Sequence, residues 1–347
     1  MSSFTSVTLA ERPTDKVVPG TTFTTKQQEI PNASVLQDGE VLFQTLYLSL
    51  DPAMRGWLND KRSYIPPVQI GEVMRGAGIG IVKASKSQKF PIGTYVSGMC
   101  GWSEYAVLKE KDLESLDLPE GAVLTDSLGV LGMTALTAYF GILDVGQVKK
   151  GDFVVVSGAA GATGSVVGQI AKLKGATVLG LAGGDDKVKW LKEELGFDEA
   201  LNYKDPEFAK NFRAATKGLI DVYFDNVGGE ILDMALSRAK PHARFVMCGG
   251  ISEYNKAERQ GLKNYLMIIS MRIRMQGFIV FDYAKQFPEA KKQLAQWLSE
   301  GKLKRKETIV KGGLPKAEQA LLDLFNGANT GKLLVEVATP ESAKSKL

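Results

Sequence analysis

The chain has 347 residues, of which 44% are hydrophobic and 24% charged, and its formal net charge is +4. These proportions are typical of a soluble globular protein with two domains, and no apolar run is long enough to predict a membrane-spanning helix. We expect no secretory signal in the polar N-terminal segment. The modest charge, spread over scattered lysines, predicts neither a nucleic-acid nor a membrane partner.

Cysteine and histidine are scarce. The chain holds two cysteines, Cys100 and Cys248, and one histidine, His242. A structural zinc site takes about four such ligands and a catalytic site about three protein ligands, so we expect no transition-metal site. Two cysteines do not make a disulfide framework, and a reducing compartment fits. A histidine-dependent hydrolase would need His242, whose surroundings predict an exposed turn before a strand.

Residues 1–125 contain short strand-forming runs that are interrupted by glycine and proline. The clearest runs are Glu40 to Leu50, Gly76 to Lys83 and Ser103 to Leu108. Short strands at this spacing predict a β-barrel or a β-sandwich.

Residues 126–315 alternate between predicted strands and helices. A strand at Asp152 to Ser157, a helix at Ala162 to Lys174 and a strand at Ala176 to Leu181 form one βαβ unit. Further strands are predicted at Ile220 to Asp225, Arg244 to Cys248 and Ile273 to Val280. Continuous apolar strands of this kind predict a doubly wound α/β domain, with a parallel sheet covered on both faces.

The remaining residues, 316–347, begin with a helix predicted at Pro315 to Asn326. A turn and a strand at Lys332 to Val337 follow this helix. Because no polar linker separates the three regions, we expect two closely packed domains.

The most specific motif is the glycine-rich turn from Gly158 to Gly164 (GAAGATG), between the first strand and the first helix of the βαβ unit. Small residues there let the backbone approach a pyrophosphate, which lies at the helix N-terminus. Ala159 replaces the first glycine of the usual pattern. The βαβ context favours a dinucleotide site over a turn that binds nothing.

The end of the second strand bears on the choice of cofactor. An NAD site usually has an acid about 20 residues beyond the glycine-rich turn, against the ribose 2′-hydroxyl. Here the strand ends without an acid, and Lys187 follows at the start of the next helix. A lysine would attract the 2′-phosphate of NADPH. The alternatives are a solvated lysine, or a ribose contact from Asp185 or Asp186.

Two later strands also end in turns at the predicted ligand-binding edge of the sheet. Asn226 follows one strand and either hydrogen-bonds a cofactor or forms a turn with the two glycines after it. Tyr254 follows the next strand and either donates a hydrogen bond to a developing oxyanion or caps its loop.

Six runs, spread in order over most of the chain, match a known family. They are Tyr47 to Arg55, Gly132 to Tyr139, Ala159 to Ser165, Val167 to Gly175, Tyr223 to Gly229 and Cys248 to Asn255. The sequence resembles the zinc-free branch of the medium-chain dehydrogenase/reductase superfamily. Within that branch it resembles the prostaglandin reductase and leukotriene B4 12-hydroxydehydrogenase family, which includes plant double-bond reductases and curcumin reductases.

The resemblance implies a GroES-like β-barrel catalytic domain, split between residues 1–125 and 316–347, around a Rossmann NADP-binding domain at 126–315. It implies that Lys187 and Tyr203 flank the 2′-phosphate, and that Asn329 returns from the tail to the nicotinamide side. The implied NADPH contacts are Gly161, Ala162, Thr163, Gly164, Lys187, Tyr203, Asn226, Cys248, Gly249, Gly250, Ile251, Ser252, Tyr254, Phe278, Ile279, Val280 and Asn329.

The resemblance implies a metal-independent reductase of the carbon–carbon double bond in α,β-unsaturated ketones and aldehydes (enones and enals), with NADPH as cofactor. Tyr254 or a cofactor hydroxyl would stabilise the enolate oxygen, and Tyr254 or water would supply the proton. A quinone reductase of the same superfamily and a non-catalytic NADPH-binding protein are the alternatives. Ala53 and Ser270 stand where some relatives have tyrosine, which leaves the substrate pocket open.

Location and assembly give two further expectations. The terminal Ser345-Lys346-Leu347 has the sequence of a peroxisomal address, which an import receptor would read if the source is eukaryotic; otherwise we expect a cytoplasmic protein. The apolar run Ile273 to Val280 predicts a strand near an open sheet edge. Pairing of this edge with that of a second copy would give a homodimer.

Overall fold

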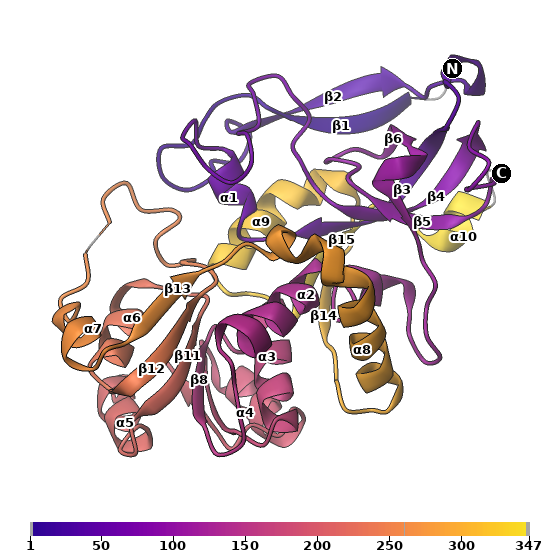
Figure 1. Ribbon diagram of the computed structural model, residues 1–347. Coiled ribbons are helices and arrows are strands. Elements are labelled where there is room, and N and C mark those ends of the chain that lie inside the picture. The colour runs from indigo at the N-terminus through magenta and orange to yellow at the C-terminus, as the bar shows by residue number, and fades with distance from the viewer. Residues whose placement is uncertain (1–2, 260, 345–347) are drawn as a thin grey trace.

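The computed structural model describes residues 3–259 and 261–344, so the terminal Ser345-Lys346-Leu347 lies outside the described residues (Figure 1). A β-rich half, at the top of Figure 1, packs against a half in which helices cover a parallel sheet. Within the described ranges, no helix is long and apolar enough to cross a membrane.

The parallel sheet has six strands in the order β10-β9-β8-β11-β12-β13. This is the order of a doubly wound dinucleotide-binding domain, and it confirms the predicted Rossmann fold. The strands are β8 (Phe153–Ser157), β9 (Thr177–Ala182), β10 (Glu199–Asn202), β11 (Ile220–Asp225), β12 (Ala239–Met247) and β13 (Arg274–Gly277).

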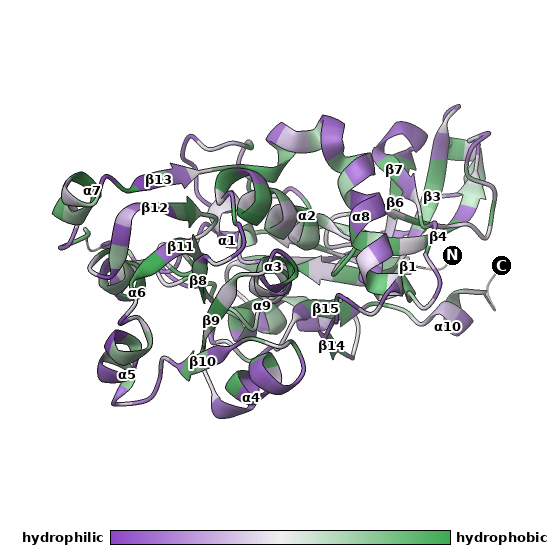
Figure 2. Cartoon of the chain, turned by 60° about the horizontal axis from the view of Figure 1, so that its bottom comes forward, coloured by the Kyte–Doolittle hydropathy of each residue, from purple (hydrophilic) through white to green (hydrophobic). Residues whose placement is uncertain are grey.

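Helices cover both faces of this sheet because its central strand buries side chains on both. Val154 and Val156 join one apolar core, and Val155 joins the other. Figure 2 shows the hydrophobic residues gathered along β8 and β11. The helical segments are α2 (Met133–Phe140), η4 (Gly141–Val145), α3 (Ala162–Leu173), α4 (Asp185–Glu193), α5 (Phe208–Ala215), α6 (Gly229–Leu236), α7 (Leu266–Ser270), η5 (Val280–Gln286) and α8 (Phe287–Ser299).

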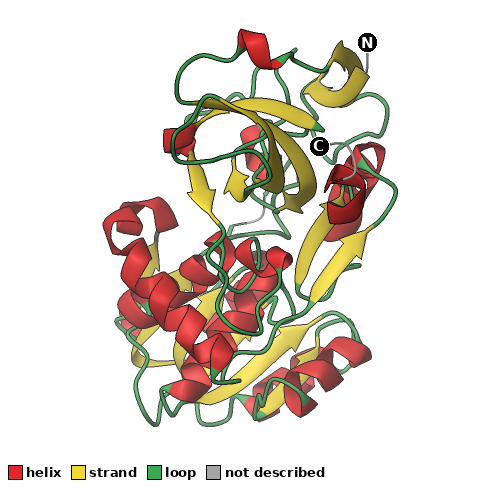
Figure 3. Ribbon diagram, turned by 90° about the vertical axis from the view of Figure 1, so that its right-hand side faces the viewer, coloured by secondary structure: helices red, strands yellow, loops and turns green. Residues whose placement is uncertain are grey.

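The other half contains a seven-stranded, mostly antiparallel sheet, whose strands curve in Figure 3. Its long strand β3 pairs with β4 on one side and with β6 and β15 on the other. The strands are β3 (Glu40–Leu50), β4 (Gly78–Ser85), β5 (Tyr95–Gly98), β6 (Tyr105–Lys109), β7 (Leu113–Ser115), β14 (Glu307–Val310) and β15 (Lys332–Glu336), beside the hairpin β1 (Ser3–Leu9) and β2 (Phe23–Glu29).

Short helical segments complete the β-rich half. Helix α9 follows the 3₁₀ turn η6, close to the helix predicted there. The segments are η1 (Ala33–Val35), α1 (Met54–Trp57), η2 (Glu110–Asp112), η3 (Leu124–Ser127), η6 (Leu314–Lys316), α9 (Ala317–Phe325) and α10 (Pro340–Lys344).

The strand predicted at Ile273 to Val280 is too long: β13 ends at Gly277, because β12 ends at its partner Met247 and residues beyond have no strand to pair with. The domain boundaries stay a prediction. However, β14 pairs with β15 in the seven-stranded sheet, although the prediction places its residues in the nucleotide-binding domain.

A buried charge cluster lies where the chain passes between the two halves. Asp126 is fully buried, forms an ion pair with Arg305 (Nε–Oδ1 2.6 Å) and accepts a hydrogen bond from the Val123 N–H (2.8 Å). Thr125 donates a hydrogen bond to Glu307 on β14 (2.9 Å). Burial raises the pKa of both the Asp126 and the Glu307 carboxyl groups. The Arg305 cation therefore compensates a carboxylate that has no access to water.

We expect Arg305→Gln to lower the free energy of unfolding, by up to about 3–5 kcal/mol, because Asp126 would remain buried without its cation. The pKa of Asp126 in the folded state already lies above its unfolded value, and removing Arg305 would raise it further. Above that pKa, Asp126 is a buried carboxylate without its cation, and this charge destabilises the folded state. The stability deficit should be largest near pH 8 and should shrink as the pH falls and Asp126 becomes protonated.

Urea unfolding of both proteins at pH 5 and pH 8 measures this effect. The exposed neighbour Lys304 provides a matched control, since Lys304→Gln should change stability little at either pH. A deficit that is equal at both pH values would show that Arg305 does not act through Asp126.

Candidate active site

The carboxyl ends of the six parallel strands lie at one edge of the sheet, where ligands bind in doubly wound folds. Every predicted cofactor residue except Asn329 follows one of these strands. They are Gly161, Ala162, Thr163 and Gly164 after β8, Lys187 after β9, Tyr203 after β10, Asn226 after β11, Cys248, Gly249, Gly250, Ile251, Ser252 and Tyr254 after β12, and Phe278, Ile279 and Val280 after β13.

The glycine-rich turn forms a narrow cradle at the start of α3. A Cβ on Gly164 would lie only 2.4 Å from the Gly158 carbonyl oxygen, so the helix can begin this close to the strand only with glycine. No side chain caps the helix at Gly161. Backbone N–H groups at such a terminus attract anions, and the cradle fits the pyrophosphate of a dinucleotide.

A fully buried carboxylate shapes the turn that carries Asn226. Asp225 accepts hydrogen bonds from the Ser157 hydroxyl (2.8 Å) and from the Gly228 N–H (3.0 Å). The Asn226 amide group in turn donates to the Ser157 carbonyl (2.7 Å). The amide nitrogen of Asn226 is thereby held by the sheet, and its side-chain oxygen is the atom left to accept a hydrogen bond from a ligand.

Sequence reasoning placed Asp225 in this turn without giving it a role, and it missed Ser157. The available signal was an acid at the end of an otherwise apolar strand. A buried acid is retained where several donors satisfy it, which is what the structure shows. Burial nevertheless raises the pKa of the Asp225 carboxyl group.

Lys187 and Tyr203 come together beside the tail of the chain. Lys187 donates a hydrogen bond from Nζ to the Gly327 carbonyl oxygen (2.6 Å). A Cβ on Gly327 would lie 3.9 Å from Lys187 Nζ and 4.0 Å from the Tyr203 hydroxyl. A Cβ on Gly183 would lie 2.4 Å from the same hydroxyl, so glycine directly after β9 makes room for the ring of Tyr203.

The electrostatics of this corner suit a phosphate. Burial, and secondly the charge of Lys204, lower the pKa of Lys187. The repulsion between these two positive charges would be relieved by an anion bound between them. The alternative ligand Asp185 accepts a hydrogen bond from Asn202 (2.9 Å), which engages its carboxylate elsewhere. The residues fit the 2′-phosphate of NADPH, and Lys204 is a member of the corner that the sequence did not single out.

The tail brings Asn329 to the glycine-rich turn. The Gly331 N–H donates to the Ala160 carbonyl (2.7 Å), and Asn329, 8% exposed, donates from its side chain to the Gly331 carbonyl (2.8 Å). The contact of Asn329 with the nicotinamide side stays a prediction.

The segment after β13 has a different character. The Phe278 ring packs on the main chain of η4, where a Cβ on Gly141 would lie 2.7 Å from it, and Val280 belongs to the apolar core. With these two side chains in the core, the main chain of the segment is the part that can reach a cofactor.

Tyr254 lies over the turn that ends β12. Its hydroxyl oxygen accepts a hydrogen bond from the Gly250 N–H (3.1 Å). Burial raises the pKa of the phenol, with smaller contributions from Cys248 and from Tyr64, which belongs to the other half. Tyr254 is therefore protonated at neutral pH, and its own O–H remains available to donate a hydrogen bond.

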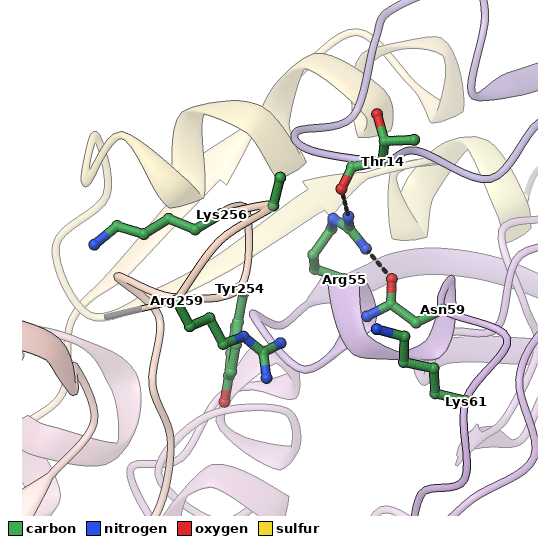
Figure 4. Close-up of a pocket in the computed structure, with 8 residues that line it drawn as sticks. Thr14, Arg55, Asn59, Lys61, Tyr254, Lys256 and Arg259 are labelled. Atoms are coloured by element: carbon green, nitrogen blue, oxygen red, sulfur yellow. Dashed lines mark hydrogen bonds between the residues drawn. The ribbon is translucent and has the colours of Figure 1, made fainter. Parts of the chain in front are cut away.

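A cavity of about 300 Å³ lies against Tyr254, between the two halves of the molecule (Figure 4). One side is formed by α1 and the residues after it, and the other by the loop after β12. The lining residues are Thr14, Arg55, Asn59, Lys61, Tyr254, Lys256, Ala257 and Arg259.

The scarce residues lie apart. His242 is exposed within β12, at a break in strand register, and has a positive φ of 64°. The sequence predicted this strand to begin at Arg244, after the histidine, whereas β12 begins at Ala239 and includes it. Across residues 3–259 and 261–344, no three His, Cys, Asp or Glu side chains form a group that could hold a metal ion.

Two known protein families match separate parts of the chain. Residues 5–116 match the N-terminal domain of oxidoreductases, and residues 162–300 match the family described as zinc-binding dehydrogenases.

Individual relatives match along almost the whole chain. The NADPH-dependent curcumin reductase of Escherichia coli is 40% identical over 95% of this chain and 96% of its own. The NADP-dependent 2-alkenal reductase of Nicotiana tabacum is 40% identical over 86% and 88%. The crystal structure of CurA from Vibrio vulnificus in complex with NADPH superposes with a TM-score of 0.90, at 39% identity, over 97% of this chain and all of that one. The chain therefore belongs to the zinc-free medium-chain dehydrogenases/reductases, in the group of NADP-dependent oxidoreductases that contains the prostaglandin, alkenal and curcumin reductases.

Proposed function

We propose that this protein uses NADPH to reduce the carbon–carbon double bond of α,β-unsaturated ketones and aldehydes. The observation that carries the proposal is the position of Tyr254, whose hydroxyl contacts the Gly250 N–H at the cofactor-binding edge of the sheet and whose side chain lines the 300 Å³ cavity. The residues named above would hold NADPH, with its pyrophosphate at Gly161–Gly164 and its 2′-phosphate at Lys187, Tyr203 and Lys204.

Bound NADPH would supply a hydride to the β-carbon of the substrate. Negative charge then develops on the substrate carbonyl oxygen, and the Tyr254 O–H can donate a hydrogen bond to it. The Gly250 N–H, which donates to Tyr254, strengthens the phenol as a donor. Tyr254 or water then supplies a proton to the α-carbon. One or two hydrogen bonds can hold an enolate, so the reaction needs no metal.

A screen of NADPH oxidation with an enal, an enone and a quinone, in buffer containing EDTA, tests the proposal. We expect the protein to turn over nonenal at the same rate with and without EDTA. Turnover of quinones alone would support the quinone reductase alternative, and tight NADPH binding without any turnover would support the non-catalytic one.

We expect Lys187→Ala to raise the KM for NADPH by about ten- to a hundredfold, the effect of losing one hydrogen bond to a charged group. The KM for NADH should hardly change, because NADH has no 2′-phosphate. The exposed Lys189, on the same helix, provides the control variant Lys189→Ala. Wild-type protein that uses both cofactors equally well would contradict the assignment of this corner.

We expect Tyr254→Phe to lower kcat, and to leave the Kd for NADPH nearly unchanged. Loss of an essential oxyanion donor costs about 10²–10³ in kcat, and we expect a smaller loss because a cofactor hydroxyl can share the role. Steady-state kinetics with several enones measures it. Unchanged kcat throughout would remove Tyr254 from the mechanism and leave the cofactor hydroxyl as the donor.

We also propose a homodimer that forms along β13. This strand is at the edge of the six-stranded sheet, and neighbouring α7 exposes Leu266 and Ile269 by 58% and 71%. Pairing two copies would cover both features. Light scattering at micromolar concentration should give twice the mass of the chain; a monomer mass would refute the proposal.

If the source is eukaryotic, we propose that an import receptor reads Ser345-Lys346-Leu347 and directs the protein to peroxisomes. Helix α10, just before this tripeptide, is anchored by Ala343, which is fully buried against the β-rich half. An N-terminal fluorescent fusion should enter peroxisomes in such cells, and removal of the last three residues should leave it in the cytosol.

A further inference from the structure

The cavity beside Tyr254 has an excess of positive charge. Four of its lining residues are cations and none is a carboxylate. The adjoining cavity, of about 490 Å³, is balanced, since it contains Glu11 and Asp15 as well as Arg12 and Lys16. Of these two cavities, the one that Tyr254 lines is therefore the one with the excess.

One of these cations, Arg55, is built into the wall. It is 2% exposed and donates hydrogen bonds to the carbonyl oxygens of Asp15 (2.8 Å from Nε) and Pro13 (3.0 Å), and to the Asn59 side chain (2.7 Å). These neutral acceptors satisfy its N–H groups without cancelling its charge. Burial lowers the pKa of Arg55. The charge of Asp15 raises it in part, and the charge of Arg259 lowers it further.

Two further cations face the same space from opposite sides of the cavity. Figure 4 shows the ends of Lys61, after α1, and Arg259, in the loop after β12, pointing toward one another. Lys256, by contrast, extends away from this space and forms an ion pair with Glu253 (2.8 Å). Within the described part of the chain, neither Lys61 nor Arg259 has a carboxylate oxygen within 4 Å.

We propose that Lys61 and Arg259 bind an anionic group carried by the substrate, with Arg55 adding its field from the wall. The inference rests on the proposed function and deepens it: the preferred substrates are α,β-unsaturated carbonyl compounds that have a remote negative charge. The anion lies between the two cations while the reactive end lies at Tyr254. Because Lys61 and Arg259 come from different halves of the molecule, the bound anion also holds the halves together over the substrate.

Two sources of anion fit this chemistry. One is the carboxylate of an unsaturated keto acid, and the other is the phosphate of an enoyl coenzyme A thioester. Both would approach the cations in a partly open site, where such pairs are screened by salt.

The test compares 8-oxonon-6-enoic acid with its methyl ester, which has the same enone but no charge. With the intact protein and NADPH, we expect a higher kcat/KM for the acid, through a lower KM. The ratio of acid to ester should fall as ionic strength rises. A ratio of one at low salt, together with no turnover of hexenoyl coenzyme A, would overturn the anion site.

Charge-removing variants locate the effect. Lys61→Gln and Arg259→Gln should each lower the ratio of acid to ester by about two- to fivefold, the range of exposed ion pairs. The ratio cancels any change that affects the reduction of both substrates equally. Lys292→Gln, an exposed lysine of α8 outside the cavity, changes the net charge equally and should leave the ratio unchanged. An equal fall in the control would show general attraction by the protein's charge, and would contradict a site at the cavity.

Binding keeps this inference separate from the proposed reaction. Calorimetry of the NADP⁺ complex with the saturated analogue, 8-oxononanoic acid, should show tighter binding than its methyl ester, with the difference lost in the double variant of Lys61 and Arg259. Reduction of the ester, with no preference for the unsaturated or the saturated keto acid over its ester and no turnover of hexenoyl coenzyme A, refutes the anion site and leaves the reductase proposal standing. Preferential binding of the saturated acid without turnover of any enone supports the site and refutes the reductase proposal. Turnover of hexenoyl coenzyme A but no preference for the keto acid assigns the site to phosphate.

Discussion

The hydrogen bond from the Gly331 N–H to the Ala160 carbonyl joins the two halves of the molecule at the point where the cofactor is expected. Gly331 has a positive φ of 69°, and a Cβ there would lie 1.8 Å from the Lys306 carbonyl oxygen. No other residue could make this crossing without moving the chain. The glycine-rich turn of one half is consequently fixed against the residue that directly precedes β15 of the other half.

A path of buried contacts leads from this crossing to the cavity. The next residue, Lys332, is 2% exposed and donates to the Asp51 carboxylate (2.6 Å) and the Leu50 carbonyl (3.0 Å). Asp51 begins the segment that forms α1, where Arg55 holds the loop at Pro13 to Asp15. The position of the cavity wall therefore depends on the same crossing that positions the glycine-rich turn, although the two lie in different domains.

This dependence explains how much could be predicted from the sequence. Local patterns carry the strands β8, β9, β11 and β12 and the turns after them, since an apolar run followed by glycines indicates a buried strand and a turn; Asn226 and Lys187 became candidates in this way. The bond from Lys187 to Gly327 joins residues 140 positions apart, and Lys61 and Arg259 belong to different domains. Each of these residues has an ordinary surface interpretation until the fold brings its partner close. The strand β13 was overestimated for a related reason: its end is set by the length of β12, and not by its own apolar residues.

A site for electrophilic enals must also avoid reacting with them. Cys248 lies at the cofactor-binding edge, and burial together with the nearby Asp225 raises its pKa to about 12. The thiolate, which is the form that adds to a conjugated double bond, is therefore scarce at neutral pH. Asp225 thus has two effects on the site: its hydrogen bonds shape the turn that holds Asn226, and its charge adds to the larger effect of burial in raising the pKa of Cys248. Tyr254 and Cys248, which both follow β12, therefore remain neutral at neutral pH, so that Tyr254 can donate a hydrogen bond to a developing oxyanion while Cys248 stays a poor nucleophile.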